Sequence, residues 1–363
     1  MKYFLLCCFL LAGCSLTVRA PEKEKKIFKV SWSKNLDPKY ESGNLPIGLG
    51  APRIFQDIVY QGSLAGTMYA YDLETGRIIW SADEKTALNG PVEYFNDHVV
   101  YGGENGRLFV RHYLTGKLRY SIDLASPIES APVYFKGRLL IYLRGHQLVH
   151  MDAETGKILW VYKRAVTVST TLQRTSRPLV LDNKIIVGFA DGYVGALSIE
   201  EGLLLWETRL AENTKFVDID LNPIVAGGTV VTGSPSGELK AVNPDNGALA
   251  RSFGVSVMAH PVLRGEQLLL GTNDGEVLLM SLNGEILKRA KVSTQPVSAV
   301  TWWKDHIIAA SFDGSLHAID PLSLKINDQF VMGYDSSSVF SDLVATEDYL
   351  AVYSSRNRLY IFH

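Results

Sequence analysis

Short stretches in which hydrophobic and polar residues alternate recur along most of the chain, separated by turns rich in glycine, asparagine and aspartate. In residues 67–71, Met68 and Ala70 would lie on one face of an extended strand, and Tyr69 and Tyr71 on the other. Successive side chains of a β-strand point to opposite faces, so this alternation is typical of strands rather than helices. The pattern therefore predicts an all-β protein.

These strands belong to one recurring sequence motif. It consists of a glycine, an alternating strand, an aspartate, a turn ending in glycine, and a short strand ending in tryptophan. Its clearest copy is residues 66–80, and it returns at 147–160, 192–206 and 237–247. The equivalent starting points are Gly66, Gly106, His146, Gly192, Gly237, Gly275, Gly314 and Asn357, which are 38 to 46 residues apart. A period of about 42 residues indicates a repeat protein built of blades or solenoid units.

A proline opens each full unit and is followed by two strands joined by a tight turn. Seven full units begin near Pro52, Pro91, Pro132, Pro178, Pro223, Pro261 and Pro296. Proline is tolerated where a strand begins, before its backbone N–H is needed by the sheet. Four antiparallel strands in about 42 residues make the blade of a β-propeller.

The two ends of the repeat array complement each other. Residues 27–33 look like the last strand of a unit, with Trp32 matching Trp80, whereas residues 342–363 look like a unit that lacks its last strand. Closing a ring removes the open sheet edges that promote aggregation. We therefore expect residues 27–363 to form an eight-bladed β-propeller of four-stranded antiparallel blades, with the N-terminal strand completing the last blade.

Composition narrows the possible chemistry. The chain has 36 basic and 38 acidic residues, which leaves no excess of positive charge for binding nucleic acid. Its three cysteines are Cys7, Cys8 and Cys14, so the predicted propeller contains no thiol and no disulfide. Metal or redox chemistry that depends on cysteine is thereby excluded from residues 27–363.

The N-terminus reads as an export signal. Residues 1–13 carry one positive charge and a short hydrophobic run that is too short to span a bilayer. Residues 11–14 resemble the bacterial lipobox, which implies cleavage before Cys14 and lipid attachment to its sulfur; an ordinary secretory signal is the alternative. Ser15 after the cysteine resembles the pattern of outer-membrane lipoproteins, and residues 14–26 would be the lipidated cysteine and a flexible tether.

Residues 70–80 resemble the tryptophan-docking repeat of the PQQ-like (quinoprotein) propeller family, in which the tryptophan packs between neighbouring blades. With the lipobox and tether, the chain resembles the lipoprotein propellers of the outer-membrane β-barrel assembly (BAM) machinery. That resemblance implies a non-catalytic scaffold without a cofactor, at the periplasmic face of the outer membrane. Its partners would be the periplasmic domains of BamA, other BAM lipoproteins and nascent outer-membrane proteins, whose strands could add to an exposed outer strand of a blade.

Residues 215–223 resemble the inter-blade segment through which these lipoproteins contact BamA, which implies partner-binding roles for Lys215, Phe216, Asp218 and Asp220. Two departures matter: a lysine replaces the family's arginine and loses its planar bidentate geometry, and residues 255–259 do not match the acidic segment expected in the next connection. The alternative is that Asp218 and Asp220 cap a turn or bind backbone amides at the entry to a blade.

Other candidate sites point away from an enzyme. An active quinoprotein dehydrogenase would need a dense set of oxygen ligands for calcium, and no segment offers one. His146 and His150 would be about 13 Å apart on a strand, too far to share a metal ion. Asp72, Asp152 and Asp320 recur at one repeat position, which favours turn capping. We expect no catalytic residue and no metal site; a scaffold of another envelope complex remains the third alternative.

Overall fold

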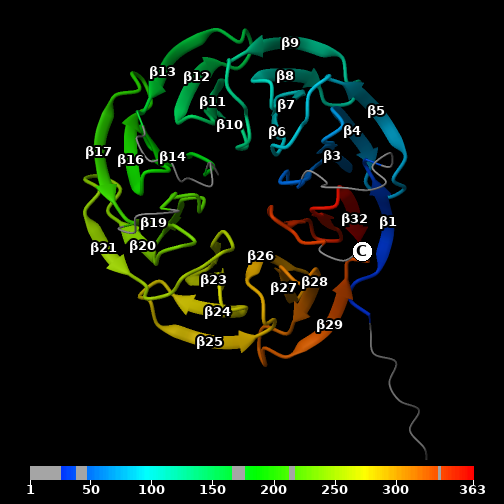
Figure 1. The fold of residues 1–363 in the computed structure, drawn as a ribbon, viewed down its shortest axis with the longest axis vertical. Coiled ribbons are helices and arrows are strands. Elements are labelled where there is room, and N and C mark those ends of the chain that lie inside the picture. The colour runs from blue at the N-terminus through cyan, green and yellow to red at the C-terminus, as the bar shows by residue number, and fades with distance from the viewer. Residues whose placement is uncertain (1–25, 38–46, 166–175, 212–216, 334–336) are drawn as a thin grey trace, which may run out of the picture.

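The computed structural model describes residues 26–37, 47–165, 176–211, 217–333 and 337–363. Within these ranges the chain forms strands and turns but no helix, so no helix there could cross a membrane. The strands make eight separate four-stranded antiparallel sheets. Figure 1 shows them arranged as the blades of a ring, which confirms the predicted eight-bladed propeller.

Blades A to D follow one another along the first part of the chain. Their strands are, in blade A, β2 (Arg53–Phe55), β3 (Ile58–Gly62), β4 (Thr67–Asp72) and β5 (Ile78–Asp83); in blade B, β6 (Glu93–Phe95), β7 (His98–Gly102), β8 (Arg107–His112) and β9 (Leu118–Asp123); in blade C, β10 (Val133–Phe135), β11 (Arg138–Leu143), β12 (Gln147–Asp152) and β13 (Ile158–Lys163); and in blade D, β14 (Leu179–Leu181), β15 (Lys184–Gly188), β16 (Tyr193–Ser198) and β17 (Leu204–Arg209).

Blades E to H complete the ring. Their strands are, in blade E, β18 (Ile224–Ala226), β19 (Thr229–Gly233), β20 (Leu239–Val242) and β21 (Leu249–Ser252); in blade F, β22 (Val262–Arg264), β23 (Gln267–Gly271), β24 (Glu276–Ser281) and β25 (Ile286–Lys291); in blade G, β26 (Val297–Trp303), β27 (His306–Ser311), β28 (Ser315–Ile319) and β29 (Ile326–Val331); and in blade H, β30 (Val344–Ala345), β31 (Leu350–Tyr353), β32 (Arg358–Phe362) and β1 (Val30–Asn35).

Each blade runs from the axis of the ring to its rim. The first strand of a blade lies nearest the centre and the fourth lies outermost (Figure 1). The predicted prolines stand one or two residues before the seven innermost strands β2, β6, β10, β14, β18, β22 and β26. There they open a strand without removing a ladder hydrogen bond. The repeat units read from the sequence therefore match the blades.

The N-terminal strand closes the ring as expected. Strand β1 pairs with β32 in antiparallel register, with Trp32 opposite Ile361, and so becomes the outermost strand of blade H. The backbone N–H groups of Ile27 and Phe28, just before β1, both donate to Oδ2 of Asp328 in blade G, at 2.7 and 2.9 Å. The first strand is thus held by the last blade and by its neighbour.

Neighbouring blades are locked together by the repeated tryptophans. The indole Nε1 of Trp80 donates to the backbone oxygen of Tyr113 in the next blade, at 2.7 Å. The ring also lies against Gly116, where an added Cβ would come within 2.6 Å of it. Trp32, Trp160 and Trp206 make the same bond to Leu73, Ile199 and Pro244. The interface role implied by the family resemblance is confirmed.

The hydrophobic core lies between the blades rather than at the centre of the ring. Buried residues form eight clusters, and each cluster joins the facing sheets of two adjacent blades. Small residues such as Ala70, Ala196 and Ala318 are completely buried in these layers, which lets the sheets approach closely.

Candidate partner-binding segment and central funnel

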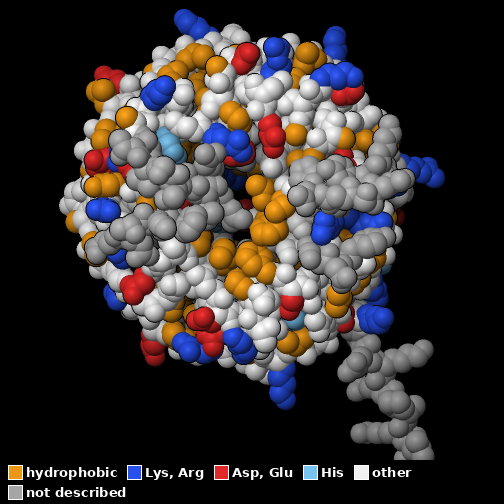
Figure 2. Space-filling model, in the orientation of Figure 1, with side chains coloured by type: hydrophobic (Ala, Val, Ile, Leu, Met, Phe, Trp, Pro, Cys, Tyr) orange, Lys and Arg blue, Asp and Glu red, His pale blue; other side chains and the backbone are white. Residues whose placement is uncertain are grey.

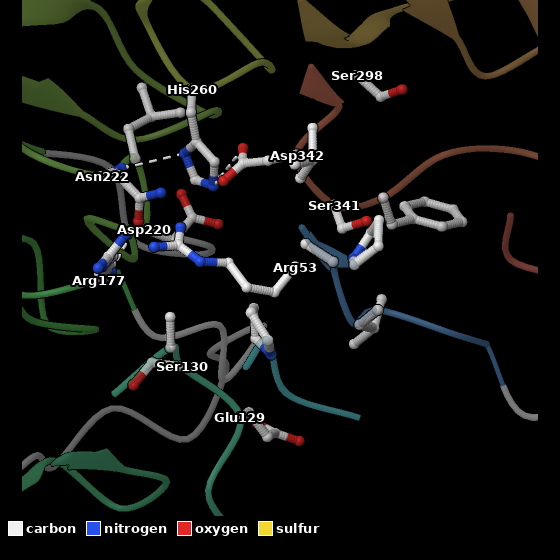
Figure 3. A pocket seen from close by; sticks show the side chains of 18 of the residues that line it. Arg53, Glu129, Ser130, Arg177, Asp220, Asn222, His260, Ser298, Ser341 and Asp342 are labelled. Atoms are coloured by element: carbon white, nitrogen blue, oxygen red, sulfur yellow. Dashed lines mark hydrogen bonds and ion pairs between the residues drawn. The ribbon is translucent and has the colours of Figure 1, made fainter. Parts of the chain in front are cut away.

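A hollow of about 190 Å³ lies on the axis of the ring, and every blade contributes to its lining. The residues come from the short segments that enter the innermost strands, and they include Arg53, Glu129, Arg177, Asp220, His260 and Asp342 (Figure 3). In Figure 2 hydrophobic side chains gather beside the central opening, whereas most lysines and arginines are spread around the rim. We call this hollow the central funnel.

Ion pairs in the central funnel link blade B to its neighbour, blade A, and to blade D, which is not its neighbour. Glu93 of blade B accepts a hydrogen bond from Nη2 of Arg53 in blade A, at 3.1 Å. Its other carboxylate oxygen pairs with Arg177 at the entry to blade D. Glu93 is buried while both arginines are partly exposed. Because the carboxylate is shared, these contacts tie three blades together across the axis.

A second chain of polar contacts runs along the opposite wall. The backbone N–H of Arg177 donates to Oδ1 of Asn222 at 2.7 Å, and the N–H of Asn222 donates to Nδ1 of His260 at 3.1 Å. His260 in turn faces Asp342, with 4.0 Å between Nε2 and Oδ1. Figure 3 shows these side chains converging from blades D, E, F and H.

The residues of the central funnel do not fit a calcium-bound quinone. No group of three or more His, Cys, Asp or Glu side chains in the described ranges is arranged to hold a metal ion. Arg53 and Arg177 could pair with the carboxylates of such a cofactor, but both are already bound to Glu93. The arrangement can fix the blades relative to one another and present mixed charge at the axis.

The structure describes two of the four predicted partner-binding residues, Asp218 and Asp220. Lys215 and Phe216 lie outside the described residues, as does Cys14. Asp218 and Asp220 are buried, with 1% and 5% of their surface exposed. Asp220 lines the central funnel beside Arg177 and Asn222 (Figure 3). Burial leaves little of either carboxylate exposed to a partner, and the partner-binding role of the two aspartates stays a prediction.

Residues 217–221 cross from the rim toward the axis between blades D and E, and they pack tightly on blade D. The N–H of Ile219 donates to the backbone oxygen of Phe189 at 3.1 Å. An added Cβ on Gly188 would stand 2.0 Å from the backbone oxygen of Ile219. Val217 and Ile219 pack in the hydrophobic cluster between blades D and E, and Leu221 packs in the cluster between blades E and F, so both cores anchor the segment.

A polar cluster that the sequence did not indicate lies between blades C and D. Arg164 follows β13 and pairs with Asp191 at 2.7 Å and with Glu207 at 2.5 Å, while its guanidinium stacks on the rings of Phe189 and Tyr193. Burial lowers the pKa of Arg164, but hydrogen bonds to Glu207 and Asp191 outweigh it and raise the pKa overall. These partners are distant in sequence, so only the blade order brings them together.

His146, at the edge of the same cluster, and His150 do not form a shared site. Burial lowers the pKa of His146, while the nearby carboxylates of Asp191 and Asp218 act in the opposite direction. His150 packs on Trp160, with ring centroids 4.9 Å apart. As predicted, Asp72, Asp152 and Asp320 cap turns: each accepts hydrogen bonds from the residue three positions later, and those bonds lower its pKa.

Fold and repeat together define a PQQ-like β-propeller. A family model described as outer membrane protein assembly factor BamB matches residues 64–289, which is more than half of the chain. The chain therefore belongs to the BamB family.

Relatives across bacteria carry the same description. BamB of Yersinia pestis is 26% identical over 84% of this chain and 81% of its own. BamB of Escherichia coli K12 is 22% identical over 98% and 96%. The crystal structure of BamB from Moraxella catarrhalis superposes with a TM-score of 0.77, at 20% identity, over 93% of this chain and all of that one. A europium-containing methanol dehydrogenase, at 12% identity and a TM-score of 0.72, shares the fold alone.

Proposed function

We propose that this protein is a lipid-anchored, non-catalytic scaffold of the BAM complex, which binds the periplasmic domains of BamA and assists the folding and insertion of outer-membrane proteins. The observation that carries this proposal is the family match together with relatives that align over nearly their whole length. Residues 1–13 would be removed, and a lipid on Cys14 would hold the propeller at the periplasmic face of the outer membrane.

The segment around residues 211–223 is the proposed BamA contact. In this proposal Lys215 and Phe216 contact the partner. The carboxylates of Asp218 and Asp220, which are buried, hold the backbone of the segment in position. The buried side chains of Val217 and Ile219 support this role, because they anchor the segment in the core between blades D and E. A preorganised segment loses less conformational entropy when it binds.

A scaffold role also agrees with the central funnel, whose arginines are already paired and whose described residues offer no metal site. The second candidate from another class is a quinoprotein-like dehydrogenase, which shares this fold. Adding PQQ and calcium to the purified protein should leave its melting temperature and absorbance spectrum unchanged. A saturable shift in either would favour the enzyme.

The first test is to extract the lipid-anchored protein from its own membranes and identify what co-purifies. Recovery of BamA with other BAM lipoproteins is the expected result. Recovery of other envelope proteins without BamA would mean that the propeller serves a different complex.

Point variants then locate the contact. Lys215→Glu combined with Phe216→Ala should reduce BamA recovery at least ten-fold without changing the melting temperature. Lys85→Glu is the matched control, because Lys85 is an exposed lysine in the equivalent connection between blades A and B. Equal recovery with both proteins would place the BamA contact elsewhere on the ring.

Outer strands such as β17 and β25 expose alternate residues at the rim and leave one edge unpaired, so a nascent barrel strand could add there by main-chain pairing. Hydrogen exchange of the complex with an unfolded outer-membrane protein should then protect one outer strand. No protection in any blade would remove strand addition from the proposal.

A further inference from the structure

The described part of the N-terminal segment joins the propeller at its rim, where blades G and H meet. The N–H groups of Ile27 and Phe28 bind Asp328 on the outer strand of blade G, and β1 then continues as the outer strand of blade H. Phe28 also packs against Phe330 of β29, with ring centroids 6.4 Å apart. These contacts fix the point at which the preceding residues join the ring. We call this side of the propeller the G–H rim.

The attachment point limits how far the G–H rim can lie from a membrane. With the lipid that the proposed function places on Cys14, only residues 15–26 separate the bilayer from this rim. A flexible chain of that length spans roughly 20 Å, and a fully extended one spans about 40 Å. The G–H rim is therefore held close to the bilayer, whereas the other side of the ring can turn away from it.

Large hydrophobic side chains are exposed on the G–H rim. Leu322, in the turn that precedes β29, is 82% exposed, the highest value for any large hydrophobic residue in the described ranges. Ile326 at the start of β29 and Val30 at the start of β1 are 44% and 41% exposed. The place where the chain approaches the membrane therefore also presents apolar side chains to its surroundings.

The turn that carries Leu322 differs in character between blades. Four other blades have an acidic residue at the equivalent position: Glu74 in A, Glu154 in C, Glu200 in D and Asp245 in E. Blade F has Asn283, and blade B has Leu114, which is 48% exposed. Acidic turns are repelled by lipid phosphates, so the turns of blades B and G are the two best suited to enter a bilayer surface. Of these two blades, only G lies at the attachment point.

Two lysines accompany the exposed side chains of blade G. Nζ of Lys288 donates to the backbone oxygen of Leu322 at 2.7 Å, and Lys325 is exposed at the end of the same turn. The two carboxylates beside them, Asp320 and Asp328, both accept backbone N–H groups, which partly offsets their charge. Lysine beside exposed apolar side chains suits a bilayer surface, because its stem lies along apolar groups while its ammonium contacts a phosphate.

We propose that the G–H rim contacts the surface of the phospholipid bilayer in which the protein is anchored. Leu322, Ile326 and Val30 enter the headgroup layer, and the two lysines contact lipid phosphates. The inference depends on the lipid anchor of the proposed function: because the anchor keeps this rim at the bilayer, a small patch is enough to orient the ring. The propeller then stands on its edge, and the proposed BamA contact between blades D and E lies across the ring, away from the membrane (Figure 1).

Leu322→Cys tests the proposal in the mature lipoprotein. Its thiol is the only free one, because the proposed lipid occupies the sulfur of Cys14 and the other two cysteines leave with residues 1–13. The thiol is labelled with nitrobenzoxadiazole, and the protein is reconstituted into vesicles of phosphatidylethanolamine and phosphatidylglycerol with a lipid that carries a nitroxide just below its headgroup. The nitroxide should quench this label at least three times as strongly as a label on Leu114→Cys. Leu114 is the matched control, because it is an exposed leucine at the same turn position in blade B.

Ile326→Glu in the protein labelled at position 322 should reduce the quenching at least two-fold, since it places a carboxylate among lipid phosphates. Its melting temperature should not change, because Ile326 is exposed. Equal quenching at positions 322 and 114 would overturn the proposal, because the ring would then have no preferred edge, and so would quenching at neither position. The mass of the purified protein distinguishes these failures from failure of the proposed function. Lipid on Cys14 with no preferred edge would overturn the G–H rim alone, whereas an unlipidated Cys14 would overturn the anchor and this inference with it.

Discussion

At the scale of single residues, glycines set how closely the inter-blade segments approach the sheets. Gly62, Gly102 and Gly188 end the second strand of their blades, and in each an added Cβ would overlap the connection to the next blade. Overpacking of this kind forces backbone shifts that cost typically 1–3 kcal/mol. The same substitution can therefore be made at equivalent points around the ring, beside the proposed contact segment and far from it.

Gly188→Ala should displace residues 217–221, because its Cβ would stand 2.0 Å from the backbone oxygen of Ile219. We expect a loss of about 1–3 kcal/mol in the free energy of unfolding and at least a five-fold loss of BamA recovery. The measurements are urea unfolding and co-purification. Gly62→Ala, whose Cβ would meet Leu88 at 2.6 Å, is the control: it should cost similar stability but leave BamA recovery intact.

His150 predicts a pH dependence. Burial lowers its pKa in the folded protein, an effect that nearby Arg138 strengthens and Glu200 opposes. Below about pH 6.5 the unfolded chain takes up a proton that the folded protein resists, so stability falls as the pH drops from about 7 to about 5. His150→Phe should lose less unfolding free energy across that range, measured by urea unfolding at both ends. An identical loss in both proteins would contradict this account.

At the scale of elements, the blade is a sheet whose last strand also belongs to the next blade's interface. The indole of Trp80 leaves β5, covers the turn at Gly116 and bonds to the chain at Tyr113. Sheets of this size have an exposed outer face and depend on burial of their other surfaces. The docking side chain therefore stabilises two blades together, and its removal should weaken the contact between them.

Trp80→Ala should lower the free energy of unfolding by about 3–5 kcal/mol, the usual cost of removing a large buried ring. Trp80→Phe should lose less, because it keeps part of the ring volume and gives up the bond to Tyr113. Chemical unfolding followed by tryptophan fluorescence and circular dichroism would measure both. A cost below about 1 kcal/mol for Trp80→Ala would show that the junction is held by other contacts.

At the scale of the whole molecule, stability depends on closing the ring. Eight core clusters form a continuous circle, and the cluster between blades H and A contains Trp32 of β1 as well as Tyr71 and Leu359. Removing β1 would take away an outer strand and that docking indole together. It would also expose the edge of β32, which presents unpaired backbone groups to other molecules.

A chain that lacks residues 1–35 should therefore associate or aggregate, whereas one that lacks only residues 1–25 keeps β1 and should remain monomeric. Size-exclusion chromatography with light scattering distinguishes the two outcomes. If both chains elute as monomers with the same melting temperature, ring closure by β1 contributes little, and the propeller holds its shape through the other seven junctions.

The sequence by itself determined the repeat, the number of blades, the closing strand and the turn-capping roles of Asp72, Asp152 and Asp320. Each of these is written in contiguous residues, where strand alternation and turn chemistry act locally. Only the tertiary structure decided the sharing of Glu93 by Arg53 and Arg177, the cluster around Arg164, and the burial of Asp218 and Asp220. These contacts depend on which side chains come together when distant blades close around one axis, and no local sequence pattern specifies them.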